Sequence, residues 1–141
     1  MALKDLAWRQ AESEFETFFP GKRSYVYAFE DTREAQKTGG SRRIFTKARP
    51  SDYVVVHEGE MFFAEVKYTI DPKTFAFGSA LRKEQWACAI QTVSAGGKYD
   101  VFVKCGADQK WYRIPAKYLI ELLPFRKSIN WTEIPQYVLI R

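Results

Sequence analysis

The segment spanning residues 52–68 constrains the fold of this 141-residue chain more than any other part of the sequence. Two largely apolar runs, residues 52–56 and 61–68, are separated by four residues that include Glu58-Gly59. This spacing predicts a β-hairpin in which Glu58 and Gly59 are the two loop residues. In that register Asp52 lies directly opposite Glu65 on the next strand.

An opposed pair of carboxylates needs a compensating charge. Because side chains alternate along a strand, Lys67 points to the same face of the sheet as Glu65 and the acid pair, while Val66 points to the other face. Two carboxylates about 5 Å apart repel each other by on the order of 3 kcal/mol at an effective dielectric near 20. A divalent cation would remove that penalty, and carboxylate oxygens without histidine or thiolate favour Mg²⁺ or Mn²⁺ over Zn²⁺. The residues therefore predict a metal site in which Lys67 orients a water or offsets charge on a phosphate.

The string formed by Asp52 and, after the hairpin, Glu65-Val66-Lys67 resembles the signature of the PD-(D/E)XK nuclease superfamily. Pro50 departs from that signature by one position, because Ser51 lies between it and Asp52. The resemblance implies an α/β fold with a restriction-endonuclease-like core, in which a central mixed β-sheet is flanked by α-helices. It also implies that Asp52, Glu65 and the Val66 carbonyl hold Mg²⁺, for which Mn²⁺ can substitute.

Residues 3–19 read as a helix that Pro20-Gly21 ends, with an apolar stripe at helical spacing. Glu12 lies within that stripe and is the glutamate expected to face the sheet. Considered without the neighbouring motif, Glu12 could instead be a glutamate at the edge of the helix that binds an arginine or water. In Holliday-junction resolvases an N-terminal helical glutamate joins the metal cluster, and the surrounding Ala11-Glu12-Ser13-Glu14-Phe15 is similar to that motif. The resemblance therefore adds Glu12 to the site, through a water, with Glu14 as the reserve.

The net charge of +5 and the pI near 9.2 favour a polyanionic partner. Six cations and one acid lie between Arg33 and Arg49, around Thr38-Gly39-Gly40-Ser41. Such a loop can neutralise phosphates and lets the backbone approach a DNA strand, although a solvated connection would have the same composition. The predicted DNA contacts are Ser41, Arg42, Arg43, Lys47 and Arg49.

The remaining pattern predicts strands over residues 23–29, 99–105 and 110–114 and a short helix over 116–123. Residues 75–78 are expected to form a loop, and a helix is expected from an N-cap at Ser79 to Gly96-Gly97. Gln85 lies at the edge of the buried face of that helix, where it can look into an active site. Bacterial RecU-like resolvases carry a comparable glutamine, usually after a histidine, whereas Glu84 precedes it here. A further edge strand is expected over 137–140.

Length and composition predict a single domain, with a core over residues 3–123 and a tail over 124–141. No apolar run approaches the length of a membrane helix and no signal-peptide pattern is present, so we expect a protein of the cytoplasm of a prokaryotic cell or phage-infected host that does not bind membranes. The two cysteines form no metal or disulfide pattern. Three aromatic residues, Trp111, Tyr112 and Trp131, could stack on bases, but core packing is expected for the first two.

The resemblance to archaeal and bacterial RecU-like Holliday-junction resolvases covers residues 12–114. It implies a Mg²⁺-dependent endonuclease that cuts four-way DNA junctions, with Glu12, Asp52, Glu65, Lys67 and Gln85 as catalytic residues. Symmetric cleavage of a junction needs two active sites, so it also implies a homodimer. Two alternatives stay open. One is another nuclease of this superfamily, of phage or restriction type, that cuts duplex or flap DNA. The other is a non-catalytic nucleic-acid-binding module in which the two acids merely pair with Lys67 and Arg49.

Overall fold

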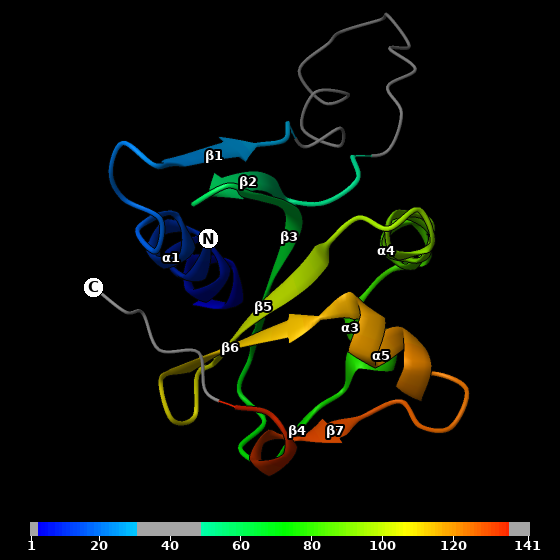
Figure 1. Ribbon diagram of the computed structural model, residues 1–141. Coiled ribbons are helices and arrows are strands. Elements are labelled where there is room, and N and C mark those ends of the chain that lie inside the picture. The colour runs from blue at the N-terminus through cyan, green and yellow to red at the C-terminus, as the bar shows by residue number, and fades with distance from the viewer. Residues whose placement is uncertain (1–2, 31–48, 136–141) are drawn as a thin grey trace, which may run out of the picture.

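The chain forms an α/β structure with a mixed five-stranded sheet flanked by helices, as the sequence predicts (Figure 1). The computed structural model describes residues 3–30 and 49–135, with side chains from Leu6 onward. Its elements are α1 (Leu3–Glu16), β1 (Ser24–Ala28), β2 (Tyr53–His57), β3 (Glu60–Thr69), β4 (Thr74–Phe75), α3 (Phe77–Ala80), α4 (Lys83–Ser94), β5 (Tyr99–Cys105), β6 (Lys110–Pro115), α5 (Ala116–Leu122), β7 (Ile129–Asn130) and a 3-10 turn, η1 (Trp131–Glu133).

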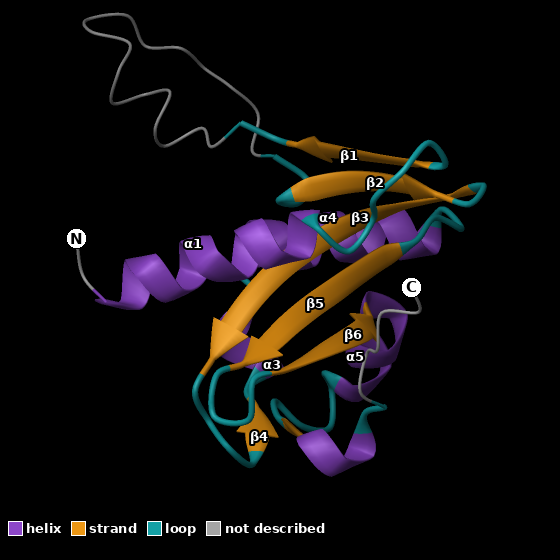
Figure 2. Cartoon of the chain, turned by 90° about the vertical axis from the view of Figure 1, so that its left-hand side faces the viewer, coloured by secondary structure: helices purple, strands orange, loops and turns teal. Residues whose placement is uncertain are grey.

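The sheet has the strand order β1-β2-β3-β5-β6, with β1 at one outer edge (Figure 2). Neighbouring strands are antiparallel except for β3 and β5, which are parallel and joined through α4. The β2–β3 register pairs His57 with Glu60 and Tyr53 with Ala64. Both loop residues have positive φ, 49° at Glu58 and 83° at Gly59, as a two-residue hairpin turn requires. The predicted hairpin is therefore confirmed, and its register leads to Asp52 opposite Glu65.

The two faces of the sheet are covered by different helices (Figure 1). Helix α1 packs on one face through Ala11 and Phe15, and Phe19 follows just after the helix; their neighbours include Val55, Phe62, Ala64, Val66 and Phe102. The helices α3, α4 and α5 pack on the other face, where the buried residues include Phe77, Leu81, Val101, Val103 and Leu119. Glu65 and Lys67 belong to this second face, because they alternate with Ala64 and Val66 along β3.

The prediction that one helix begins at an N-cap on Ser79 is wrong for the first turn. Residues 77–80 form the separate short helix α3, and α4 begins at Lys83 with Arg82 as its N-cap. Gln85 supplies the missing cap, since its side-chain oxygen accepts the Arg82 backbone N–H at 2.8 Å. The other end follows the prediction, because Gly96 has φ +87° and ends the helix in a Schellman arrangement of backbone hydrogen bonds.

The prediction of a loop over residues 75–78 is also partly wrong, because Thr74–Phe75 is the short strand β4. It pairs with β7, so part of the tail after residue 123 returns to the core. The tail places Ile129, Trp131 and Ile134 in the same hydrophobic cluster as Phe75. The three aromatic residues considered for base stacking, Trp111, Tyr112 and Trp131, are all buried.

No helix within the described part of the chain is long and apolar enough to cross a membrane. The edge strand expected over residues 137–140 lies outside the described residues.

Candidate active site

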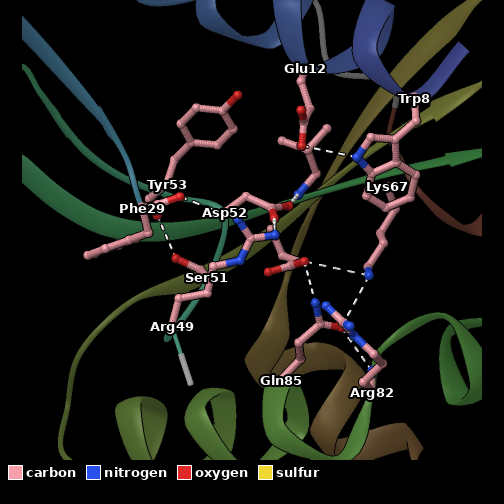
Figure 3. A network of polar contacts seen from close by, with 12 residues as sticks. Trp8, Glu12, Phe29, Arg49, Ser51, Asp52, Tyr53, Lys67, Arg82 and Gln85 are labelled. Carbon is pink, nitrogen blue, oxygen red and sulfur yellow. Dashed lines mark hydrogen bonds and ion pairs between the residues drawn. The ribbon is translucent and has the colours of Figure 1, made fainter. Parts of the chain in front are cut away.

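Asp52 lies just before the start of β2, opposite Glu65 of β3. Figure 3 shows Asp52 and its surroundings. The Asp52 Oδ2 atom accepts a hydrogen bond from the Val66 backbone N–H at 2.8 Å, so this side chain extends the strand pairing beyond the last paired residues of β2. Asp52 and Glu65 are only 3% and 1% exposed. The opposition predicted from the hairpin is therefore present, in a setting where both carboxylates are withdrawn from water.

Arg49 provides the positive charge closest to Asp52. Its Nη2 atom lies 2.7 Å from Asp52 Oδ1, and its Nη1 atom donates to the Phe29 carbonyl at 3.3 Å. The sequence assigned Arg49 to DNA backbone contacts, but the structure brings it to the acid pair. A cation that binds Asp52 would therefore compete with Arg49 for the same carboxylate.

Glu65 is held by side chains from two elements, Lys67 on β3 and Gln85 on α4 (Figure 3). Gln85 Nε2 donates to Glu65 Oε1 at 2.5 Å, and Lys67 Nζ lies 3.5 Å from the same oxygen. Gln85 Oε1 accepts from both Lys67 Nζ at 3.1 Å and the Arg82 backbone N–H at 2.8 Å. Because its oxygen has two donors and its nitrogen has one acceptor, the orientation of the Gln85 amide is fixed. One glutamine thus caps α4 and positions both charged side chains.

Tyr99, at the start of β5, is a component that the sequence reasoning missed. Its hydroxyl donates to the Pro50 carbonyl at 2.8 Å and lies 3.5 Å from Glu65 Oε2. It ties the segment before Asp52 to the strand beside Glu65. The available signal was a tyrosine at the start of a mostly apolar strand, since a buried phenol needs a polar partner.

The electrostatics of the pair show a deficit of positive charge. The pKa of Glu65 is raised to about 8, first because the group is buried and second because Asp52 is close, and Lys67 offsets only part of this rise. Burial and the nearby Asp52 thus favour the protonated form of Glu65 when no cation is bound. A bound divalent cation would favour its ionised form.

Glu12 approaches the centre from α1 (Figure 3). It is half-buried and accepts a hydrogen bond from Trp8 Nε1 at 3.0 Å. Burial raises the pKa of Glu12, and the nearby Asp52 contributes to the rise. Trp8 also lies beneath Lys67, whose Nζ atom is 5.5 Å from the indole centroid. The i, i+4 spacing of Trp8 and Glu12, which placed Glu12 in the apolar stripe of the sequence, brings the two side chains into contact.

The reserve candidate, Glu14, faces another part of the sheet. Its carboxylate binds Lys104 Nζ and accepts from Trp111 Nε1 at 2.9 Å. These contacts make Glu14 a structural partner of β5 and β6. Of these two glutamates, only Glu12 lies close enough to Asp52 for the charge of Asp52 to raise its pKa.

The donor set fits a hard cation that retains water ligands. Among residues 3–30 and 49–135, no three or more histidine, cysteine, aspartate or glutamate side chains converge as a metal-binding group. Glu12 is therefore placed to act through water, and direct ligands would be Asp52, Glu65 and the Val66 carbonyl. Mg²⁺ usually binds through one or two carboxylates and keeps several waters, which matches this set.

Four predicted DNA contacts, Ser41, Arg42, Arg43 and Lys47, lie outside the described residues. The structure thus brings together Asp52, Glu65, Lys67 and Gln85, with Arg49, Tyr99 and Glu12 around them. No protein-family model matches the chain, and no curated protein matches its sequence.

Proposed function

We propose that this chain is a Mg²⁺-dependent endonuclease with a PD-(D/E)XK core that hydrolyses phosphodiester bonds in branched DNA, with four-way junctions as its substrate. One observation carries the proposal. Two buried carboxylates from adjoining strands face each other, and Lys67 and Gln85 are fixed beside Glu65. The raised pKa of Glu65 supports it further, because burial and the neighbouring Asp52 disfavour its negative charge, which a divalent cation would stabilise.

The site's chemistry follows from the residues around the pair. Mg²⁺ bound by Asp52, Glu65 and the Val66 carbonyl would supply an acidified water and stabilise negative charge on the phosphate. Lys67 stands beside the pair with its ammonium group held by Gln85, so it can orient a water and offset charge without moving. Glu12 can accept a hydrogen bond from a water on the α1 side. Arg49, once released from Asp52, can pair with a phosphate oxygen.

The four-way junction and the homodimer rest on the resemblance to Holliday-junction resolvases. The net charge of +5 suits DNA of any geometry. Duplex and flap substrates are therefore the comparison that tests the junction assignment.

A non-catalytic binding module is the second candidate, and specific contacts favour it. The Arg49–Asp52 and Lys67–Glu65 ion pairs expected for that function are both present. In that case the acids would only stabilise the fold and DNA binding would not need a metal. The two candidates differ in whether removing one acid changes cleavage or only stability.

Cleavage of a four-way junction, a linear duplex and a flap, each with Mg²⁺ or EDTA, tests the proposal. We expect Mg²⁺-dependent cutting of the junction and a loss of about a thousandfold or more in Asp52→Asn, which keeps junction binding. Asp100→Asn is the matched control, because Asp100 is also buried and paired with an arginine, Arg113, away from the acid pair. If Asp52→Asn still cuts at the normal rate, the metal assignment is wrong. Binding without cutting on any substrate would support the second candidate.

A further inference from the structure

An exposed row of aromatic side chains lies on the outer strand of the sheet. Tyr25 and Tyr27 on β1 are 60% and 49% exposed, whereas the aromatic residues singled out in the sequence for base stacking are buried. Their rings are 6.4 Å apart with an angle of 25° between their planes. Large aromatic surfaces are not normally left in water on an edge strand unless something binds them.

The row lies on the same face of the sheet as Glu65. In the register of β1, β2 and β3, Val26 pairs with Val55, which pairs with Phe62, and all three pack toward α1. The alternate residues, Tyr25 and Tyr27, therefore point to the opposite face. On β3 that face carries residues 63, 65 and 67.

Ring contacts that become progressively more buried connect the row with the acid pair. Tyr27 contacts Phe29 at a ring distance of 5.5 Å, Phe29 lies 6.3 Å from Phe63, and Phe63 lies 6.2 Å from Tyr99. The Tyr99 hydroxyl is 3.5 Å from Glu65 Oε2. A ligand lying on Tyr25 and Tyr27 would therefore lie on the same face of the sheet as the candidate catalytic carboxylates.

The spacing of the row suits an extended polynucleotide. Residues i and i+2 of a strand are about 6.7 Å apart, which allows successive unstacked bases to meet successive rings. Base stacking on aromatic side chains is tolerant of sequence, because every base has a π-face. Lys22 and Arg23, both exposed directly before β1, offer charge to a phosphate backbone. The acids nearest to this end are Glu58 and Glu60 at the hairpin turn, and Glu60 is paired with Lys98.

We propose that Tyr25 and Tyr27 form a stacking platform for an unpaired DNA strand next to the acid pair. The substrate would then carry single-stranded DNA, as a flap or as the opened centre of a branch. Only the consequence for cleavage rests on the proposed nuclease function, because strand binding by the platform needs no metal chemistry.

Binding of fluorescein-labelled oligothymidylate, measured by anisotropy in EDTA, tests the platform. We expect the double variant Tyr25→Ala/Tyr27→Ala to bind about 10- to 100-fold more weakly. Tyr25→Phe/Tyr27→Phe should retain the affinity, since stacking needs the ring and not the hydroxyl. Tyr118→Ala is the matched control, because Tyr118 is an exposed tyrosine on α5, a helix that packs against β5 and β6 and not against β1. It should bind as the wild type does.

Two results would overturn the platform. One is that the wild type and the double alanine variant bind the oligonucleotide with equal affinity, or that neither binds it. The other is that the double alanine variant is a monomer in sedimentation velocity where the wild type is a dimer, while its affinity for the oligonucleotide is unaltered. This face would then be an interface between copies of the chain. Strand binding that depends on the tyrosines, with no cleavage of any substrate in Mg²⁺, would instead contradict the nuclease proposal and leave the platform standing.

Discussion

Asp52 and Glu65 face each other, yet the structure holds them in different ways. Glu65 lies on β3, a strand paired on both sides, and its partners Lys67 and Gln85 come from regular secondary structure. Asp52 lies just before β2, and its cationic partner Arg49 is three residues earlier, in a stretch outside helix and strand. The difference teaches that Glu65 is positioned by the fold, whereas the charge beside Asp52 can be exchanged.

A cation entering the pair would therefore act on each acid differently. At Asp52 it competes with the Arg49 guanidinium, and at Glu65 it competes with a proton, since the pKa of Glu65 is raised to about 8. Among the neighbours of the two acids, substitutions on the Glu65 side should be the most damaging, because Lys67 and Gln85 are held to Glu65 and to each other.

Lys67→Met should produce the largest effect among the neighbours of Glu65. Cleavage should fall by about 100- to 1000-fold, because an oriented positive charge beside the phosphate is lost. Steady-state cleavage in Mg²⁺ measures this. Lys104→Met is the matched control, since Lys104 is also buried but pairs with Glu14. Equal activity losses in the two variants would contradict a catalytic role for Lys67.

Gln85→Met should follow, with two separable consequences. Cleavage or Mg²⁺ affinity should fall by about 10- to 100-fold, because Lys67 and Glu65 lose a shared partner. The free energy of unfolding should fall by about 1 kcal/mol, because the Arg82 N–H loses its cap. Gln91→Met, on the exposed side of α4, should change neither quantity. A variant that loses stability alone would limit Gln85 to capping.

Glu12→Gln tests the Asp52 side and should lower cleavage by about tenfold, at the weak end of the range for groups that act through water. Glu14→Gln is its control. It should lower the free energy of unfolding, because Lys104 loses its anion, without a comparable loss of cleavage. If Glu14→Gln impairs cleavage more than Glu12→Gln does, the assignment of the two glutamates is reversed.

A pH-dependent change in stability is expected without any substitution. The folded pKa of Glu65, about 8, exceeds its ordinary value of 4.5, so the folded state holds the extra proton between those values. In EDTA, the stability that Glu65 contributes should be complete below pH 4.5 and be lost as the pH rises through 8, at no more than about 1.4 kcal/mol per pH unit.

Denaturant unfolding across that range, with EDTA or Mg²⁺, checks this linkage. Mg²⁺ should flatten the decline, because it replaces the proton, and Glu65→Gln should remove the contribution of this group. A decline that is the same in Mg²⁺ and in EDTA would show that no cation binds the pair.

The sequence predicted the parts of the structure that depend on local rules. The Glu58-Gly59 turn fixed the hairpin register, and strand alternation then placed Lys67 on the face of Glu65. The helical stripe similarly identified Glu12. Each of these inferences uses a short repeat or a turn whose geometry leaves few alternatives.

What escaped prediction depends on contacts between distant residues or on unusual chemistry. The pairing of β4 with β7 joins Thr74 to Asn130 through strands of two residues, which are too short to show periodicity. The start of α4 was misplaced because Arg82 is not a common N-cap residue and its cap comes from Gln85. The exposure of Tyr25 and Tyr27 was hidden because an aromatic edge strand has the same pattern as a buried one.

The two-residue hairpin turn also indicates where this chain can be lengthened. An extra residue within β2 or β3 would reverse the direction of every side chain beyond it and separate the two acids. Residues added between Glu58 and Gly59 would project from the end of the hairpin, about 17 Å of strand away from Asp52. A peptide tag or a fluorescent label inserted there should leave the paired carboxylates in place.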